Sequence, residues 1–271
     1  MTWIWACLLG LAALIGAFLY WKLRYFLRDP PRRIPPGEQH IVAAADGFIT
    51  YVKRVEAGEI PIAIKQRRRI ALTELTALDP APTSAGYLIG TYMTERSVHR
   101  NRSPVGGEIV LREHRSAAPF NRSMARMTAN LVLGRRPYET DCEYLLANER
   151  LTIGIRAAGG ATVTVTQIAD VWVSRIVARV SVGDRLARGQ QYGMIRLGSQ
   201  CDVFLPDELV ERVLVEPGQY VWAGESVLAL ARLRLDDASL QEGGADQTTR
   251  GRKPSRQAPR NASHMSVGGC A

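Results

Sequence analysis

The sequence predicts a mainly β protein of the α+β class, preceded by one N-terminal hydrophobic helix. Residues 3–21 contain no charged residue. Between residues 39 and 235, short β-branched runs alternate with Gly and Pro, and long amphipathic patterns are scarce. At 271 residues, with 46% hydrophobic and 23% charged content, the chain can bury one ordinary core or two small ones. One folded domain over residues 40–235 is therefore expected.

The apolar run at residues 3–21 has the length of a membrane span. At about 1.5 Å per residue it reaches roughly the 30 Å thickness of the hydrocarbon layer. Aromatic residues stand at both ends, where they suit the two interfaces: Trp3, Trp5, Tyr20 and Trp21. A cleaved signal peptide is the alternative, but basic residues follow the run instead of preceding it, and no clear small-residue cleavage site appears. Residues 1–21 are predicted to form a single transmembrane helix.

Basic residues crowd the linker at residues 22–39. The positive-inside tendency then places the folded domain in the cytoplasm. The net charge of +9 and a pI of about 9.7 could suggest nucleic acid, but these cations lie where anionic lipid head groups would be. We therefore expect an anionic bilayer surface as partner and no nucleic acid. The linker cations are Lys22, Arg24, Arg28, Arg32 and Arg33, and a second run, Lys65 with Arg67, Arg68 and Arg69, is either a solvated loop or a contact to lipid phosphate.

The cysteines and the C-terminal end carry no predicted chemistry. The four cysteines, at positions 7, 142, 201 and 270, show no metal-ligand spacing, and a cytoplasmic domain gives no reason to expect disulfides. Residues 236–271 are rich in Gly, Ser, Gln, Arg and Pro without apolar periodicity, which predicts a disordered tail. No metal site is expected.

Local patterns predict individual elements within the domain. Strands are expected at residues 161–168, 172–180 and 200–205, and helices at residues 123–133 and 207–212, the second opening after Pro206. Residues 180–190 and 215–225 form an internal repeat, in which a Gly turn, an apolar residue and a second Gly precede an apolar strand. The repeat resembles the barrel-sandwich pattern of biotinyl and lipoyl domains. No Met-Lys-Met modification site accompanies it, so the likeness concerns architecture alone.

Several short strings, in order along the chain, resemble the shorter bacterial and archaeal class of phosphatidylserine decarboxylases. Each string alone is weak, and their order and joint presence make the resemblance specific. They are Tyr25-Phe26-Leu27-Arg28-Asp29-Pro30, Ala45-Asp46-Gly47, Val98-His99-Arg100-Asn101-Arg102-Ser103-Pro104-Val105, Asn148-Glu149-Arg150, Gln167-Ile168-Ala169, Tyr192-Gly193-Met194-Ile195-Arg196-Leu197-Gly198-Ser199 and Asp202-Val203-Phe204-Leu205-Pro206.

The resemblance implies self-cleavage between Gly198 and Ser199. The Ser199 hydroxyl would attack the Gly198 carbonyl, which a side chain does not shield, and convert the amide into an ester. Elimination and hydrolysis would then leave a pyruvoyl cofactor at position 199, and the protein would consist of its own two chains. This cofactor would act as the electron sink for decarboxylation of phosphatidylserine to phosphatidylethanolamine and CO2.

Catalytic roles for Asp46 and His99 also follow from the resemblance. A serine hydroxyl needs a base, and an imidazole held by a carboxylate is the usual solution. Outside this context an Ala-Asp-Gly aspartate is most often a turn residue and a lone histidine is structural. The family strings favour His99 as base and later proton donor, with Asp46 as its partner.

The chain also departs from the family pattern around His99. Ser97 and Arg100 replace more usual residues, and Arg102 stands where larger relatives carry a second histidine, which leaves open whether His99 alone serves both processing and turnover. Arg102 and Arg150 are the candidates for binding the lipid phosphate, although an arginine beside a turn is more often structural.

Two alternatives remain beside a lipid decarboxylase in a bacterial-type inner (cell) membrane. One is a pyruvoyl decarboxylase for another amino-acid head group. The other is a non-catalytic, membrane-tethered adaptor in which Gly198-Ser199 is only a turn. The membrane helix favours a lipid substrate, and a homo-oligomer stays open.

Overall fold

The computed structural model describes residues 2–56, 59–60, 70–71, 76, 85–117, 119–171, 176–195 and 199–232. The predicted tail, the basic run at residues 65–69, residues 172–175 of one predicted strand, and Gly198 lie outside these residues.

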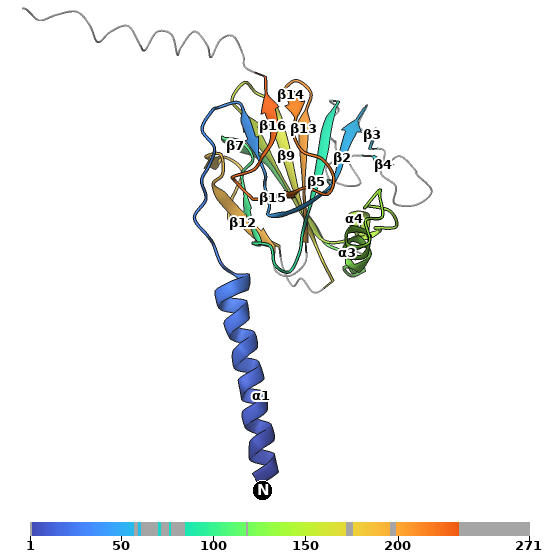
Figure 1. Cartoon of the computed structure of the whole chain (residues 1–271). Helices are drawn as coiled ribbons and strands as arrows, with labels where there is room; N and C mark the ends of the chain where they lie inside the picture. Colours follow the sequence, from blue (N-terminus) through green and yellow to red (C-terminus); the bar gives the residue numbers. More distant parts are fainter. Residues whose placement is uncertain are drawn as a thin grey trace, which may run out of the picture. The chain divides into compact units, whose positions relative to one another are not determined.

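An eight-stranded sheet forms the centre of the described fold, in the order β11-β7-β8-β9-β13-β5-β2-β15 with antiparallel neighbours (Figure 1). The mainly β prediction is confirmed. The strands are β11 (Arg185–Leu186), β7 (Gly107–Arg115), β8 (Arg150–Ala157), β9 (Thr162–Ala169), β13 (Ser199–Pro206), β5 (Gly86–Met93), β2 (Gly47–Val55) and β15 (Tyr220–Val221).

Smaller sheets complete the described β-structure. The sheet β10-β12-β6 adjoins the site, and β1-β16-β14 and the pair β3-β4 lie elsewhere in the chain. Their strands are β10 (Ile176–Ala178), β12 (Gln191–Ile195), β6 (Arg100–Arg102), β1 (His40–Val42), β16 (Val227–Ala231), β14 (Val210–Val213), β3 (Glu59–Ile60) and β4 (Ile70–Ala71).

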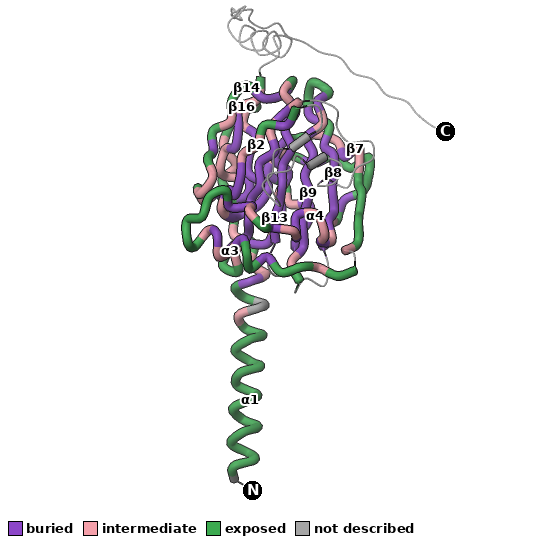
Figure 2. The backbone as a smooth tube through the Cα atoms, turned by 90° about the vertical axis from the view of Figure 1, so that its right-hand side faces the viewer, coloured by how far each residue is buried: buried purple, intermediate pink, exposed green. Residues whose placement is uncertain are grey.

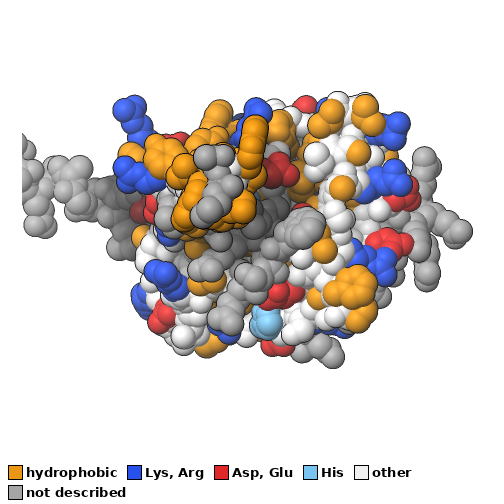
Figure 3. All heavy atoms as spheres, turned by 90° about the horizontal axis from the view of Figure 1, so that it is seen from below, with side chains coloured by type: hydrophobic (Ala, Val, Ile, Leu, Met, Phe, Trp, Pro, Cys, Tyr) orange, Lys and Arg blue, Asp and Glu red, His pale blue; other side chains and the backbone are white. Residues whose placement is uncertain are grey.

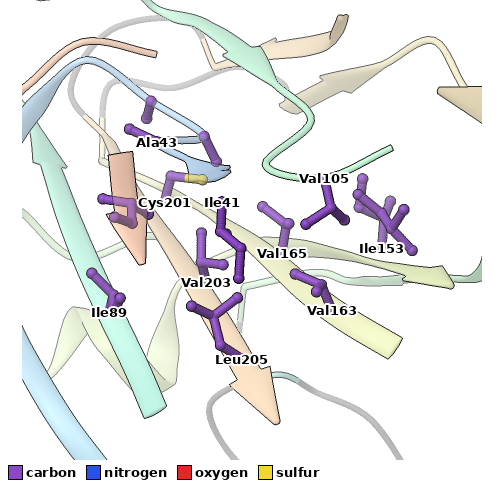
Figure 4. Packing of buried hydrophobic residues seen from close by; sticks show 14 of the residues in the cluster. Ile41, Ala43, Ile89, Val105, Ile153, Val163, Val165, Cys201, Val203 and Leu205 are labelled. Carbon is purple, nitrogen blue, oxygen red and sulfur yellow. The ribbon is translucent and has the colours of Figure 1, made fainter. Parts of the chain in front are cut away.

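Strand β13 shows how one strand serves two different faces. Successive side chains of a strand point to opposite sides of the sheet. Cys201, Val203 and Leu205 enter the main hydrophobic core, where they meet residues of β1, β5, β8 and β9 (Figure 4). Gln200 and Asp202 point to the other face, which α3 (Ala125–Val132) and α4 (Tyr144–Ala147) partly cover. Figure 2 shows that β13 and its neighbour β9 are buried along almost their whole length.

The internal repeat is present in the structure. Corresponding glycines have similar positive φ angles, +95° and +98° at Gly183 and Gly218, and +75° and +78° at Gly189 and Gly224. Glycine adopts these angles without the clash that a Cβ would cause. Their N–H groups donate equivalent hydrogen bonds, from Gly183 to Ile109 O at 2.8 Å, Gly218 to Ile49 O at 2.7 Å, Gly189 to Ser103 O at 2.8 Å and Gly224 to Ala43 O at 2.8 Å. The likeness to biotinyl and lipoyl domains stays a prediction.

Among the predicted helices, one is confirmed and one is wrong. The helix expected at residues 123–133 is α3. The helix expected at residues 207–212 is instead a turn followed by β14. The Asp207 carboxylate pairs with Arg54, and Val210 and Val213 pair with β16, so tertiary contacts override the local helix-start pattern.

The N-terminal helix α1 (Thr2–Tyr20) continues into a π-helical turn, η1 (Trp21–Phe26). Residues 3–26 have the length and composition of a membrane span, with mean hydropathy 2.0. The most apolar 18 residues of this stretch are not buried inside the protein. Figure 2 shows α1 exposed along its length. A bilayer would cover a helix this apolar and this exposed.

Candidate active site

Ser199 is the first residue of β13 and lies in the middle of the large sheet. It opposes Met93 of β5 on one side and Ala169 of β9 on the other, and its side chain is fully buried. Its Oγ lies 3.2 Å from the Met93 Sδ. The residue is therefore held by backbone pairing on both sides, and within the described part of the chain the acceptor for its hydroxyl is the weakly accepting Met93 sulfur.

His99 is a fully buried histidine just before β6. Its Nδ1 lies 2.9 Å from the Ser97 carbonyl oxygen. Because a carbonyl only accepts, Nδ1 carries the proton, and Nε2 of the neutral ring holds a lone pair. That Nε2 is buried and has no hydrogen-bond partner in the described part of the chain. Such an orphaned acceptor is what a serine hydroxyl could use.

Burial also keeps the His99 ring neutral. Desolvation lowers its pKa from 6.5 to about 4, the Ser97 carbonyl opposes this shift, and the Arg28 guanidinium adds to it. At neutral pH the imidazole is therefore a proton acceptor and not an imidazolium.

One backbone hydrogen bond and one side-chain contact connect the His99 segment with the surroundings of Ser199. The His99 carbonyl accepts from Ile195 N at 3.1 Å, and β12 then leads through residues 196–198 into β13. The Met93 sulfur, beside Ser199, also lies 3.9 Å from Asn101 Nδ2 on β6. No hydrogen bond joins His99 to Ser199 among the described residues.

The aromatic ring of Phe26 covers His99. The two ring centroids are 4.2 Å apart with planes inclined by 35°, and Phe26 is 1% exposed. Phe26 ends η1, so the polypeptide that leaves the apolar helix forms one wall of the site.

Asp46 is buried, but it does not hydrogen-bond to His99 in this structure. Its Oδ2 accepts from Arg32 Nη2 at 2.9 Å, and its Oδ1 accepts from Ala223 N at 2.7 Å. The glycine after it is required because a Cβ on Gly47 would lie 2.1 Å from the Tyr92 carbonyl oxygen. Asp46 thus ties the linker to the domain.

The two candidate phosphate-binding arginines lie in different places. Arg102 is on β6, next to the His99 segment, where it pairs with Asp29 at 2.6 Å and donates to Gly189 O at 3.1 Å. Arg150 is 1% exposed, and its Nε donates to Asn148 O at 3.1 Å.

The sheet register separates Arg150 from Ser199. Arg150 opposes Ile168, which opposes Gln200, so Arg150 lies on the Gln200 face and Ser199 points to the opposite face. Desolvation lowers the pKa of Arg150 to about 10, and repulsion from Arg115 contributes to the lowering.

A buried polar network occupies the Gln200 face. Tyr51 donates to Asp202 Oδ2 at 2.7 Å, Gln200 Nε2 donates to Asp202 Oδ1 at 2.8 Å, and Tyr144 donates to Gln200 Oε1. Desolvation raises the pKa of Asp202 to about 7, although the hydrogen bonds from Gln200 and Tyr51 oppose this. This network fixes β13 immediately after Ser199.

Four residues of the site were not assigned roles from the sequence: Phe26, Met93, Asn101 and Gln167. Asn101 Oδ1 accepts from Gln167 Nε2 at 2.8 Å beside the Met93 sulfur. Three of the four stand inside the strings that carried the family resemblance, and that was the available signal. Met93 stands outside every such string, and only the register of β5 with β13 shows its place.

Comparison with known proteins identifies the family. The family model for phosphatidylserine decarboxylase matches residues 20–229. The phosphatidylserine decarboxylase proenzyme of Nitrosomonas europaea is 34% identical over 227 residues, covering 84% of this chain and 83% of that protein. The proenzymes of Symbiobacterium thermophilum and Ruegeria pomeroyi are 32% and 34% identical and cover 80% and 79% of this chain, and 87% and 81% of their own lengths.

Together with the mainly β fold and the buried serine and histidine, these matches define the class of protein, a carboxy-lyase. More narrowly, the chain belongs to the phosphatidylserine decarboxylase family.

Proposed function

We propose that this protein is a membrane-bound phosphatidylserine decarboxylase that cuts itself between Gly198 and Ser199 and converts Ser199 into a pyruvoyl group. The observation that carries the proposal is the pair of buried groups at one end of the sheet. Ser199 heads a central strand, and His99 presents an unpartnered, unprotonated Nε2. Relatives that share about a third of the sequence are named proenzymes, which fits a chain that must be processed.

The self-cleavage begins with nucleophilic attack by Ser199. His99 Nε2 accepts the hydroxyl proton while Oγ bonds to the Gly198 carbonyl carbon, and the C–N bond then breaks to give an ester and a free amine at position 199. Removal of the Ser199 α-proton expels the Gly198 carboxylate. Hydrolysis of the remaining enamine releases ammonia and leaves a ketone carbonyl at position 199.

The surroundings of position 199 fit a cofactor at the start of a chain. In the uncut chain β13 pairs with β5 over Ser199–Pro206 and with β9 over Ser199–Phe204, and the pairs from Gln200 onward would remain after cleavage. The two chains therefore stay in one sheet. A pyruvoyl group at this position supplies the electron sink for decarboxylation of an α-amino acid.

His99 would also serve the repeated reaction. A buried imidazole with a lowered pKa can hold a proton briefly at Nε2 and return it to the α-carbon after CO2 leaves. Asp46 would support this site through Arg32 and the linker in the arrangement described, and a direct Asp46–His99 contact would need a rearrangement of that ion pair.

The proposal of a lipid substrate rests on α1 and on the basic linker residues that follow it. A single-pass helix with a cytoplasmic domain on a bacterial-type inner membrane would hold the site next to its lipid. Figure 3 views the molecule from below and shows hydrophobic side chains grouped on one part of this face, with Lys, Arg, Asp and Glu side chains scattered around them. Arg102, partly exposed beside the site, is the better placed of the two arginines to bind a lipid phosphate.

A substrate comparison tests this function against the two alternatives. Purified protein should release CO2 from phosphatidylserine in vesicles, and free serine in solution should release at least tenfold less. Equal release from a soluble amine would favour a different pyruvoyl decarboxylase. A single unprocessed band without CO2 release would favour the adaptor.

A further inference from the structure

The segment that joins the apolar helix to the domain lies against the catalytic residues. Phe26 stacks on His99 with ring centroids 4.2 Å apart. The following residues are fastened to three separate parts of the domain. Leu27 O accepts from Arg100 Nη2 at 3.1 Å, Asp29 pairs with Arg102 at 2.6 Å, Arg32 pairs with Asp46 at 2.9 Å and Arg33 N donates to Glu225 Oε1 at 2.7 Å.

These contacts use residues on both sides of the site. Arg100 and Arg102 come from β6, directly after His99, and Asp46 stands just before β2. Arg32 and Asp46 are each only 4% exposed, so their ion pair is shielded from water and salt. Residues 26–33 are thus held in one position, and Phe26 with them.

Building on the proposed function, we propose that Phe26 is a positioning residue for His99, so that the membrane linker is part of the self-processing site. The ring closes one face of the imidazole, limits its rotation about χ2, and keeps water from the unpartnered Nε2. The linker would then be needed for self-cleavage and not only for delivery to the bilayer.

Burial of the His99 base explains why the Phe26 ring would affect proton transfer. The groups that face His99 are the Ser97 carbonyl at Nδ1, the Arg28 guanidinium and the Phe26 ring, with Tyr220 hydrogen-bonded to the Ser97 hydroxyl at 3.3 Å. Without the phenyl ring, water would solvate the imidazolium form, and its pKa would rise from about 4 toward 6.5. The ring would also lose its fixed direction.

The first experiment measures His99 directly. In full-length Ser199→Ala protein, which cannot be processed, the imidazole titration is followed by NMR with and without Phe26→Ala. We expect the pKa of His99 to rise by at least one unit in Phe26→Ala. Tyr25→Phe is the control, because Tyr25 is 41% exposed and a phenyl ring keeps the face that lies 4.1 Å from the Arg28 guanidinium, so Arg28 stays in place.

The second experiment measures self-cleavage in chains that retain Ser199. Processing of Phe26→Ala should slow by about tenfold at neutral pH, less than the roughly 10²- to 10⁴-fold loss expected when the base itself is removed, and its acid limb should move to higher pH. Phe26→Leu keeps an apolar cover without a flat ring. It should fold normally and show a smaller change of the same sign, which keeps the test decisive if Phe26→Ala misfolds.

The outcomes separate the two proposals. If the wild-type chain processes itself but neither Phe26 variant changes the pH profile or the His99 titration, Phe26 does not position the base. If the wild-type chain does not process itself at all, the proposed function fails, and the role of Phe26 in processing fails with it. In that second case the titration alone still reports whether the ring covers His99.

Discussion

At the scale of residues, the proposed mechanism depends on one neutral imidazole, that of His99, whose two nitrogens would have different roles. Nδ1 is held by the Ser97 carbonyl, and Nε2 is left for a proton. A backbone carbonyl fixes the ring here, where serine-histidine sites commonly use a carboxylate. The Ser97 carbonyl has no titratable proton, so this interaction does not change with pH. The Asp46 carboxylate is instead paired with Arg32 of the linker.

Loss of the base should slow self-cleavage strongly. We expect His99→Ala to process about 10² to 10⁴ times more slowly than wild type, the usual contribution of a positioned base. The appearance of the two chains with time on a denaturing gel gives this rate. His114→Ala is the control, because His114 is exposed and pairs with Glu149 on the edge of β7 and β8. Similar slowing in both variants would point to a general folding defect.

The pH dependence of processing should follow the same group. The base must be neutral, and burial lowers its pKa to about 4. The rate should therefore stay level from pH 8 down to about pH 5 and fall below that. A decline centred near pH 6.5 would instead indicate a solvent-exposed histidine.

Asp46→Asn tests the ion pair that holds the linker. The amide cannot neutralise Arg32, and breaking a buried pair costs roughly 3 kcal/mol of folding free energy. Processing should slow without stopping, because His99 keeps its Ser97 contact. Chemical denaturation of the Ser199→Ala and Ser199→Ala/Asp46→Asn proteins measures the difference in stability, and equal stability would show that the pair is not formed.

At the scale of elements, β13 links catalysis to the fold. Its first residue is the proposed nucleophile, and its next polar residues form the network with Tyr51 and Tyr144 on the opposite face. After cleavage this strand would begin a new chain inside a sheet, where pairing on both sides holds it.

Asp202 should make stability fall as pH rises. Its pKa is about 7 in the folded state, against 3.8 for the free group. Protonation therefore favours folding, so its contribution is complete below pH 3.8 and is lost as pH rises to about 7. The loss is on the order of 4 kcal/mol. Denaturation of Ser199→Ala protein at pH 5 and pH 8 should show this decline, and Asp202→Asn should flatten it, whatever its effect on absolute stability.

Sequence patterns predicted the elements better than they predicted the contacts between them. The Gly-turn repeat, the helix at residues 123–133 and the strand at residues 200–205 follow from local signals, because glycine turns, helical patterns and short β-branched runs can be recognised from neighbouring residues. The helix prediction at residues 207–212 was wrong because Asp207 forms an ion pair with Arg54, which is distant in sequence.

The site shows the same limit. The family strings selected Ser199, His99 and Asp46, but they could not show that Asp46 faces Arg32, that Phe26 covers His99, or that Arg150 lies on the other face of the sheet. Each of these depends on register or on chain segments far apart in sequence.

At the scale of the whole molecule, an apolar helix leads directly into the wall of the buried site. Residues 3–26 are long and apolar enough to span a bilayer, and Phe26 is where this stretch meets His99. In the proposed account this helix would hold the enzyme on the bilayer beside its lipid, and Phe26 would belong to both the anchor and the active site.

Membrane attachment should resist salt. Salt screens the attraction between the basic linker and anionic lipid but leaves hydrophobic insertion intact. The protein should stay in the membrane fraction after a wash at about 1 M salt. Full release would show that attachment is electrostatic and that residues 3–21 do not span the bilayer.

Intact mass measurement of the purified protein tests self-processing most directly. The wild-type protein should give a large chain that ends at Gly198 and a small chain of 73 residues, since 271 minus 198 residues remain. The small chain should be lighter by one ammonia than the same chain with an N-terminal serine. Ser199→Ala should give one uncut chain, because it lacks the attacking oxygen. Two normal fragments from Ser199→Ala, or an uncut wild-type chain, would contradict the account.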